Sequence, residues 1–184
     1  MIAHEMAGQT RAAEEEYQRA LTLPSINRTL IEGTALAQAM GARDRASLQR
    51  LLPRAIEAGP DQAAINGAAL KYLDDPPAAL RELHRLIDEP GIQREMYTLA
   101  ALGLWAAYFG DDTLALDALR RTQRSGVTIE SWGISLWRPV MKGVRRLAGF
   151  KDLLREQGLV DYWRKSGNWG EFCKPVGADD FECR

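Results

Sequence analysis

Apolar side chains recur along this sequence at the spacing of an α-helix. In one stretch, Leu80, Leu83, Leu86 and Ile87 form a single apolar stripe, flanked by charged residues. Glycine, proline and aspartate residues separate such stretches, as is typical of helix ends and turns. No stretch alternates apolar and polar residues convincingly, so the pattern predicts no sheet. We therefore expect an all-α protein.

The helical stretches form a repeat. Four turn positions are separated by 33, 33 and 36 residues: Gly8, Gly41, Asp74 and Gly110. An alanine follows each turn after five residues: Ala13, Ala46, Ala79 and Ala115. A small residue lies seven positions before three of the turns: Thr34, Gly67 and Gly103. Small side chains at both places allow two helices to approach closely, so the spacing predicts stacked helix hairpins.

This repeat resembles the tetratricopeptide repeat, whose unit is a helix–turn–helix of 34 residues. The best matches are GQTRAAEEEYQRAL (residues 8–21) and LAALGLWAAYFGDDTLALDAL (residues 99–119), in which the family's Leu-Gly pair falls on Leu102-Gly103. The family's first Trp is missing, and we expect Pro53 to interrupt the second helix of one unit. The resemblance implies an α-α superhelix of about three and a half units over residues 1–125. Its register places Met1 inside a first helix, so we expect the first hairpin to begin upstream, with a frayed tail as the alternative.

Residues 126–184 lose this period and are rich in aromatic side chains. They contain four of the five tryptophans, Trp132, Trp137, Trp163 and Trp169. We expect one or two short helices around Ala148-Gly149, ended by Gly158, in a Trp-rich cap packed on the last repeat within the same domain. The elements GLVDYWR and WGEFC are similar to the C-terminal end of tetratricopeptide-type regions in bacterial signalling proteins. Those proteins include winged-helix transcription regulators and adenylate or guanylate cyclases, so the resemblance implies a regulatory or interaction module.

Both cysteines lie in this cap, in the segment FCKPVGADDFEC. Pro175 and Gly177 favour a turn between Cys173 and Cys183, which makes a small disulfide loop geometrically reasonable. Two free thiols and half of a metal site are the alternatives. Metal is the weakest of the three, because a zinc site needs about four ligands and the two histidines, His4 and His84, lie far away in the sequence. The choice between disulfide and thiols depends on the compartment in which the protein resides. The two alternatives for that compartment are the cytoplasm and the periplasm, the latter as part of a membrane-anchored regulator.

Charge and composition exclude several classes of function. The chain has 24 basic and 25 acidic residues, a net charge of -1, so we expect no direct nucleic-acid binding. Its apolar stretches are too short for a membrane span. The motifs of nucleotide, zinc, calcium and serine-hydrolase sites are missing, and we expect no enzyme activity, no cofactor and no metal. The paired aspartates Asp74-Asp75 and Asp111-Asp112 are interpreted as turn and helix-cap residues. Basic residues concentrate where the repeats meet the cap and are interpreted as a solvated, paired face: Arg120, Arg121, Arg124, Lys142, Arg145, Arg146, Lys151 and Arg155.

Protein or peptide binding is the function that remains. In tetratricopeptide arrays the first helices line a concave groove, and the resemblance places six residues of this chain there: Arg28, Gln38, Lys71, Tyr72, Tyr97 and Tyr108. Tyr72 and Tyr108 occupy the same place in successive units. We therefore expect a noncatalytic interaction or regulatory module, as the C-terminal part of a larger bacterial signalling or transcription regulator. The alternatives are a small enzyme that uses an aromatic C-terminal pocket and a structural module that self-associates, for instance as a homodimer.

Overall fold

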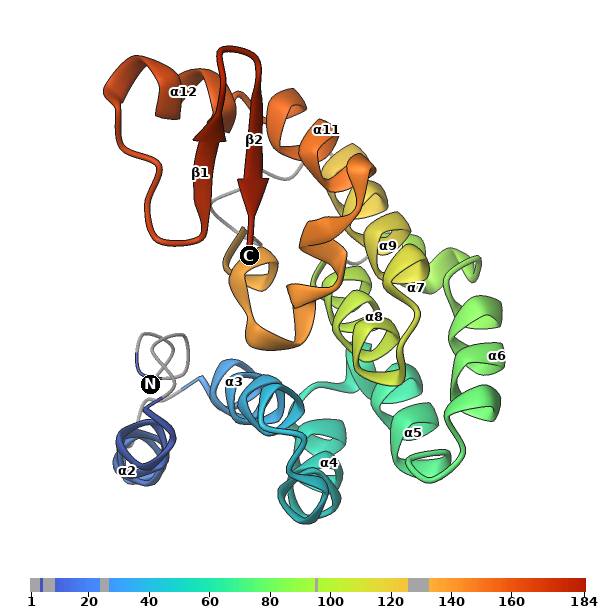
Figure 1. Cartoon of the computed structure of the whole chain (residues 1–184). Coiled ribbons are helices and arrows are strands. Elements are labelled where there is room, and N and C mark those ends of the chain that lie inside the picture. Colours follow the sequence, from blue (N-terminus) through green and yellow to red (C-terminus); the bar gives the residue numbers. More distant parts are fainter. Residues whose placement is uncertain (1–3, 5–8, 24–26, 95, 126–132) are drawn as a thin grey trace.

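The computed structural model describes residues 4, 9–23, 27–94, 96–125 and 133–184. Most of these residues are helical, as the apolar pattern predicts (Figure 1). The helices of the first section are α2 (Thr10–Leu21), α3 (Arg28–Gly41), α4 (Arg45–Ala58), α5 (Ala63–Lys71), α6 (Pro76–Leu86), α7 (Pro90–Arg94), α8 (Met96–Phe109) and α9 (Asp112–Arg124). A short 3-10 turn, η1 (Pro60–Gln62), precedes α5. Apart from His4, the first helix that we expected over residues 1–6 lies outside the described residues.

Consecutive helices pack as pairs joined by short turns, α3 with α4, α5 with α6, and α8 with α9. Aspartates begin the second helix of each pair. Asp44, Asp75 and Asp111 accept a hydrogen bond from the backbone N–H three residues later, at 3.1, 3.0 and 2.8 Å. Such an N-cap contributes about 1 kcal/mol to helix stability. The interpretation of Asp75 and Asp111 as helix caps is therefore confirmed.

The repeated alanines have one position in common. Ala13, Ala79 and Ala115 lie four residues after the N-cap of α2, α6 and α9, and all three are buried. Ala46 does not follow this rule and is exposed. The reason is that α4 begins after Asp44, three residues beyond the Gly41 turn, so Leu48 takes the buried position instead.

The small residues in the first helices have different roles. An added Cβ at Gly103 would lie 3.3 Å from the backbone oxygen of Ala115 and 3.5 Å from the Cβ of Ala118. The two helices therefore approach closely at Gly103, as the repeat predicts, and leave little room for a side chain there. At Gly67 an added Cβ would meet nothing within 4 Å, so no such approach exists there.

The expected interruption at Pro53 is wrong, because α4 continues from Arg45 to Ala58 with the proline inside it. Pro53 itself is exposed, whereas Leu51, Leu52 and Ala55 around it are buried. A proline ring removes one backbone hydrogen bond from a helix. The packing of the apolar face holds α4 together across this missing bond.

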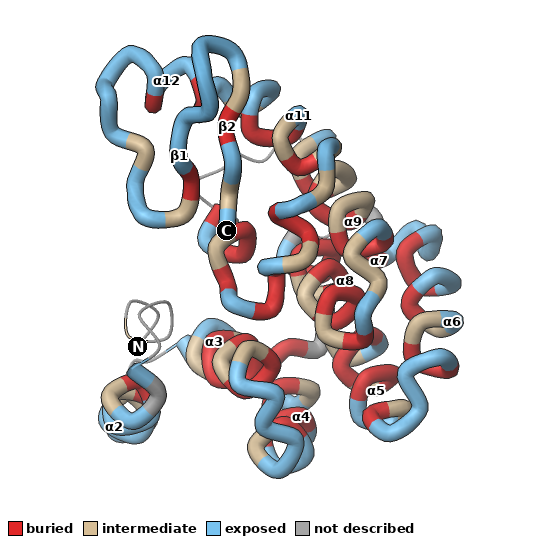
Figure 2. Tube along the Cα trace, viewed as in Figure 1, coloured by how far each residue is buried: buried red, intermediate tan, exposed pale blue. Residues whose placement is uncertain are grey.

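The cap begins with three 3-10 turns, η2 (Gly133–Trp137), η3 (Pro139–Lys142) and η4 (Val144–Arg146). Helix α11 (Ala148–Glu156) follows around Ala148-Gly149 as expected, and α12 (Leu159–Ser166) begins after Gly158, where the sequence predicted only a stop. The turn η3 packs against α3 and α8, and α11 packs against α9. Buried residues therefore continue from the helix pairs into the cap (Figure 2).

The chain also contains a small sheet, which the prediction of an all-helical fold did not include. Strands β1 (Cys173–Val176) and β2 (Asp180–Cys183) pair antiparallel, with Cys173 opposite Cys183 and Val176 opposite Asp180. The turn between them uses Gly177 at φ 60. Each strand has four residues, too few to produce a visible alternation of apolar and polar side chains.

Within the described part of the chain, no helix combines the length and the apolar character that crossing a bilayer requires.

Candidate functional site

A cavity of about 440 Å³ opens between the first helices of successive pairs. Its walls come from α3, from η1 with α5, from α8, and from η2 with Arg138, which together bring four separate parts of the sequence to one place. The lining is mixed. Its apolar part includes Leu30, Leu36, Met40, Tyr97, Leu104, Trp105 and Ile134. A volume of this size is in the range of sites that bind ligands. We call this cavity the groove.

Three large apolar side chains of the groove are exposed to solvent. Leu30 of α3 is 60% exposed, Tyr97 of α8 is 57% exposed and Ile134 of η2 is 40% exposed. Exposed apolar side chains are unremarkable one by one, but several that share one concavity are typical of a binding surface. The groove thus brings exposed apolar surface from three elements of the described chain together.

Gly33 lies in the middle of α3 and lines the groove. An added Cβ at this position would meet nothing within 4 Å. A glycine in a helix interior destabilises the helix by about 1 kcal/mol relative to alanine. Neither a turn nor a close helix contact explains Gly33, and its effect is to leave the wall of the groove hollow.

The floor of the groove contains a buried polar pair from α5 and α8. Trp105 donates from Nε1 to Oδ1 of Asn66 at 3.0 Å, and the two residues are 1% and 2% exposed. The indole of Trp105 stacks on Phe109, with ring centroids 5.7 Å apart, and meets the edge of Tyr108 at 5.5 Å. These contacts hold the indole, and through it the Asn66 amide, in one orientation.

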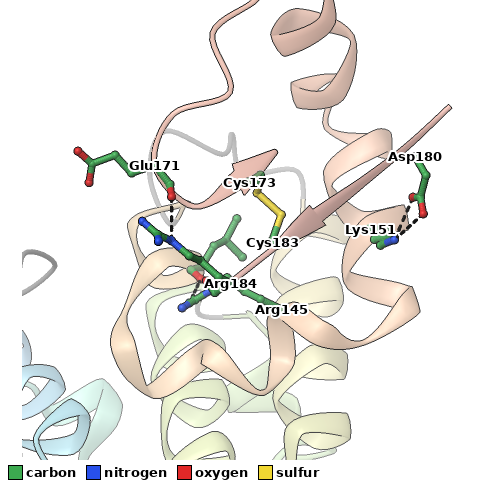
Figure 3. Close-up of a disulfide and its surroundings, with 8 residues drawn as sticks. Arg145, Lys151, Glu171, Cys173, Asp180, Cys183 and Arg184 are labelled. Atoms are coloured by element: carbon green, nitrogen blue, oxygen red, sulfur yellow. Dashed lines mark hydrogen bonds and ion pairs between the residues drawn. A yellow bond between two sulfur atoms is a disulfide. The ribbon is translucent and has the colours of Figure 1, made fainter. Parts of the chain in front are cut away.

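Arg145 supports the wall of the groove that the cap provides. Its guanidinium donates to the backbone oxygen of Arg184 at 2.6 Å (Figure 3). It also donates to the backbone oxygens of Leu136 and Arg138, at 2.9 and 3.0 Å. Arg145 is 5% exposed, and burial lowers the pKa of Arg145 to about 10, so it is still charged at neutral pH. Our interpretation of Arg145 as part of a solvated face is wrong, because three carbonyl groups draw this side chain inside the cap.

The rest of the basic cluster includes surface ion pairs. Arg121 contacts Asp88 at 2.7 Å and Asp117 at 2.9 Å, and Lys151 contacts Asp180 at 2.8 Å. Arg155 contacts Asp152 at 3.2 Å and Asp180 at 3.3 Å. Pairing of this kind is what the sequence predicts for a solvated charged face.

The six residues that the resemblance places in a groove are divided by the structure. Tyr97 lines the cavity, and the other five are not part of its described lining. Arg28 is the exposed first residue of α3, beside the lining residues Asn27 and Thr29, and Gln38 is half-buried on the same helix.

The remaining three lie at the C-terminal ends of α5 and α8. Lys71 places its ammonium 4.8 Å from the ring centroid of Tyr72, and Tyr72 is the C-cap of α5. Tyr108 packs against Trp105 and Phe109. Tyr72 and Tyr108 do occupy similar places in their helices, but those places are helix ends and not the walls of the groove. The residues that sequence reasoning missed are Gly33 and Asn66. Their signals were a glycine and an asparagine in the interior of a helix, two residue types that a helix does not favour.

Cys173 and Cys183 form a disulfide between β1 and β2 (Figure 3). Of the alternatives left open by the spacing, this is the arrangement in the structure. Among the described residues, no group of three or more His, Cys, Asp or Glu side chains could hold a metal ion. His84 instead lies beside a helix cap, with Nε2 2.9 Å from Oδ2 of Asp111.

The aromatic side chains of the cap pack against one another. Trp137 stacks on Phe172 with ring centroids 5.2 Å apart, and Trp163 contacts Trp169 at 5.5 Å and Phe181 at 6.3 Å. Basic side chains lie over several of these rings, among them Arg145 over Phe172 at 5.6 Å. These contacts form a small aromatic core, as expected for a capping segment.

The comparisons with known proteins give no family. No protein-family model matches the chain, and no curated protein and no solved structure is significantly similar to it.

Proposed function

We propose that this chain is a noncatalytic interaction module that binds a peptide segment of another protein in the groove. The observation that carries the proposal is the convergence of exposed Leu30, Tyr97 and Ile134 on one concavity. Apolar side chains of a peptide would cover them, and binding energy at interfaces comes mainly from such buried apolar and aromatic contacts. The hollow at Gly33 gives the peptide room beside α3.

We further propose that the helix pairs are units of a tetratricopeptide-like superhelix, with α3, α5 and α8 as the first helices that line its concave side. Supporting this are the recurrent buried alanines and the close contact at Gly103. In such an array the module serves a larger protein, and we propose a bacterial signalling or transcription regulator as that protein, on the resemblance of the GLVDYWR and WGEFC elements.

The proposal is tested with a library of random peptides, about twelve residues long, selected on the purified wild-type chain. The blocking variant is Gly33→Met, because its side chain would extend into the groove without meeting protein atoms at Cβ. The matched control is Gly67→Met, which introduces the same side chain into open space on α5, outside the described lining. Both substitutions replace a helical glycine and are expected to favour the helix by about 0.7 to 1 kcal/mol.

Selected peptides are expected to bind Gly33→Met at least about tenfold more weakly than wild type, because the new side chain occupies the space for an anchoring residue. Their affinity for Gly67→Met is expected to equal that for wild type. Fluorescence anisotropy with labelled peptides measures both. A selection that yields no binder, or binders that tolerate Gly33→Met, would contradict the proposal.

A further inference from the structure

The polar groups that line the groove differ in how their hydrogen bonds are satisfied. The hydroxyl of Thr34 donates to the backbone oxygen of Leu30 at 2.8 Å, and the hydroxyl of Thr98 donates to that of Asp61 at 3.3 Å. Both donors are therefore used within the protein. The side chain of Asn66 is different, because its oxygen accepts one hydrogen bond and its two N–H donors have no protein acceptor among the described residues.

The orientation of the Asn66 amide follows from its partner. An indole Nε1–H can only donate, so the atom that faces Trp105 at 3.0 Å is the oxygen Oδ1 and not the nitrogen. The nitrogen Nδ2 therefore points elsewhere with two N–H donors. Since Trp105 is itself held by Phe109 and Tyr108, the amide has no freedom to turn these donors toward another acceptor.

Among the described residues, Nδ2 of Asn66 donates to no protein group. It is not among the buried polar atoms that are sealed from solvent without a partner, and Asn66 lines the groove. The two N–H donors thus reach the groove from a residue that is only 2% exposed. When a ligand fills the groove and excludes water, donors left without an acceptor would be unfavourable, so a ligand that places an acceptor there would be preferred.

We propose that Asn66 Nδ2 donates to a carbonyl oxygen of the bound peptide, and that this contact determines specificity in the groove. The inference rests on the proposed function and identifies the chemistry that the groove recognises. The peptide would place a carbonyl oxygen at the floor and an apolar side chain beside Leu30, Tyr97 or Ile134.

The first test uses the variant Asn66→Asp with the peptides selected on wild type. Aspartate has the same shape and keeps an oxygen for Trp105, but it replaces the two N–H donors with a second acceptor. Affinity is expected to fall about tenfold or more, as for loss of a buried hydrogen bond whose partner is then unsatisfied. Circular dichroism and the NMR signal of the Trp105 indole N–H verify that the variant is folded.

The second test leaves the protein unchanged. Each peptide bond of a selected peptide is replaced in turn by an ester, whose carbonyl is a weaker acceptor, and each Asn or Gln of the peptide is replaced by Leu. A loss of affinity at one ester position identifies a main-chain carbonyl, and a loss at one Asn or Gln identifies a side-chain carbonyl. That loss is expected to disappear in Asn66→Asp, because the donor is already missing there.

The outcomes separate the two proposals. Affinity that is unchanged at every ester and every Leu position overturns the role of Asn66, whatever the Asn66→Asp variant shows. Full affinity for a folded Asn66→Asp variant overturns it as well. In both cases peptides that are blocked by Gly33→Met still support binding in the groove. A selection without binders overturns both proposals.

Discussion

The guanidinium of Arg43 lies over the ring of Tyr108, with Cζ 4.8 Å from the ring centroid, and it donates to the backbone oxygen of Tyr108. Arg43 follows the C-cap of α3, and Tyr108 is in the last turn of α8. The contact joins the ends of two helices that are 65 residues apart in the sequence. Arg43 adopts φ 54 in the turn that ends α3, where the N–H of Arg43 donates to Met40 and that of Asp44 to Ala39. This left-handed region costs a non-glycine residue about 1 kcal/mol or more.

This geometry predicts an unusual order of stability at position 43. Arg43→Ala loses the contact with Tyr108 and keeps the backbone strain, so we expect the free energy of unfolding to fall by about 2 kcal/mol. Arg43→Gly loses the same contact but relieves the strain, and we expect it to be more stable than Arg43→Ala by about 1 kcal/mol. Urea denaturation measures all three proteins.

The control for this prediction is the preceding residue, Ala42, which has right-handed backbone angles. There glycine only adds freedom to the unfolded chain, so Ala42→Gly is expected to lower stability by about 0.5 to 1 kcal/mol. An Arg43→Gly variant less stable than Arg43→Ala would contradict the account of Arg43.

Replacing Arg145 is expected to disrupt the cap. Arg145→Met leaves three backbone oxygens without their charged donor, so we expect a loss of about 3 kcal/mol or more in the free energy of unfolding. Arg145→Lys restores the charge but not the fork of N–H donors and is expected to recover only part of the loss. The exposed neighbour is the control, and Arg146→Met is expected to change stability by less than about 0.5 kcal/mol. Equal effects at the two positions would contradict this assignment.

Stability in acid is expected to depend on Asp180. Lys151 and the backbone N–H of Phe181 lower the pKa of Asp180, with a further contribution from Arg155. A carboxylate with a lowered pKa stabilises the folded state above its ordinary pKa of about 4, and this stabilisation is lost as the pH falls through the lowered value. The melting temperature of wild type is therefore expected to fall more steeply below pH 4 than that of Asp180→Asn. Asp179→Asn, one residue earlier in the turn, serves as the control and is expected to follow wild type.

The disulfide is expected to stabilise the cap through the unfolded state. It closes a loop with a sequence separation of 10, for which the loss of chain entropy on cross-linking corresponds to about 2 to 3 kcal/mol. A Cys173→Ala, Cys183→Ala double variant should lose about this much stability. Dithiothreitol should lower wild type to the level of the double variant and leave the variant unchanged. A wild-type melting temperature that is insensitive to reduction would contradict the prediction.

Much of the helical section could be predicted because its signals are local. Apolar spacing and capping aspartates such as Asp75 and Asp111 determine where helices lie and begin, and both are visible in the sequence. The error at Ala46 arose because the turn after Gly41 is longer than the others, which moved the buried position to Leu48. The strands β1 and β2 were missed because their pairing depends on a partner strand and a disulfide more than on their own pattern.

The groove was harder to predict, because it depends on how separate helices are placed. Tyr72 and Tyr108 have equal register in the repeat, yet both lie at the C-terminal ends of their helices, outside the described lining of the groove. Gly33 and Asn66 carry the groove's distinctive features, and each is a residue that a helix does not favour. Residues that are unfavourable in their own helix, and that no local contact explains, are therefore better indicators of a binding site in a chain of this kind.

The three hydrogen bonds of Arg145 connect one end of the groove to Arg184, the residue that follows β2. Arg138 lines the groove and Leu136 follows the lining residues Ile134 and Ser135, whereas Arg184 is the neighbour of Cys183 in the disulfide. Together with the stacking of Trp137 on Phe172, these bonds connect the hairpin to the wall beside Ile134. A reporter or tag fused directly after Arg184 would disturb the contact between Arg184 and Arg145 and thereby this wall of the groove. For binding studies it therefore belongs at the opposite end of the chain.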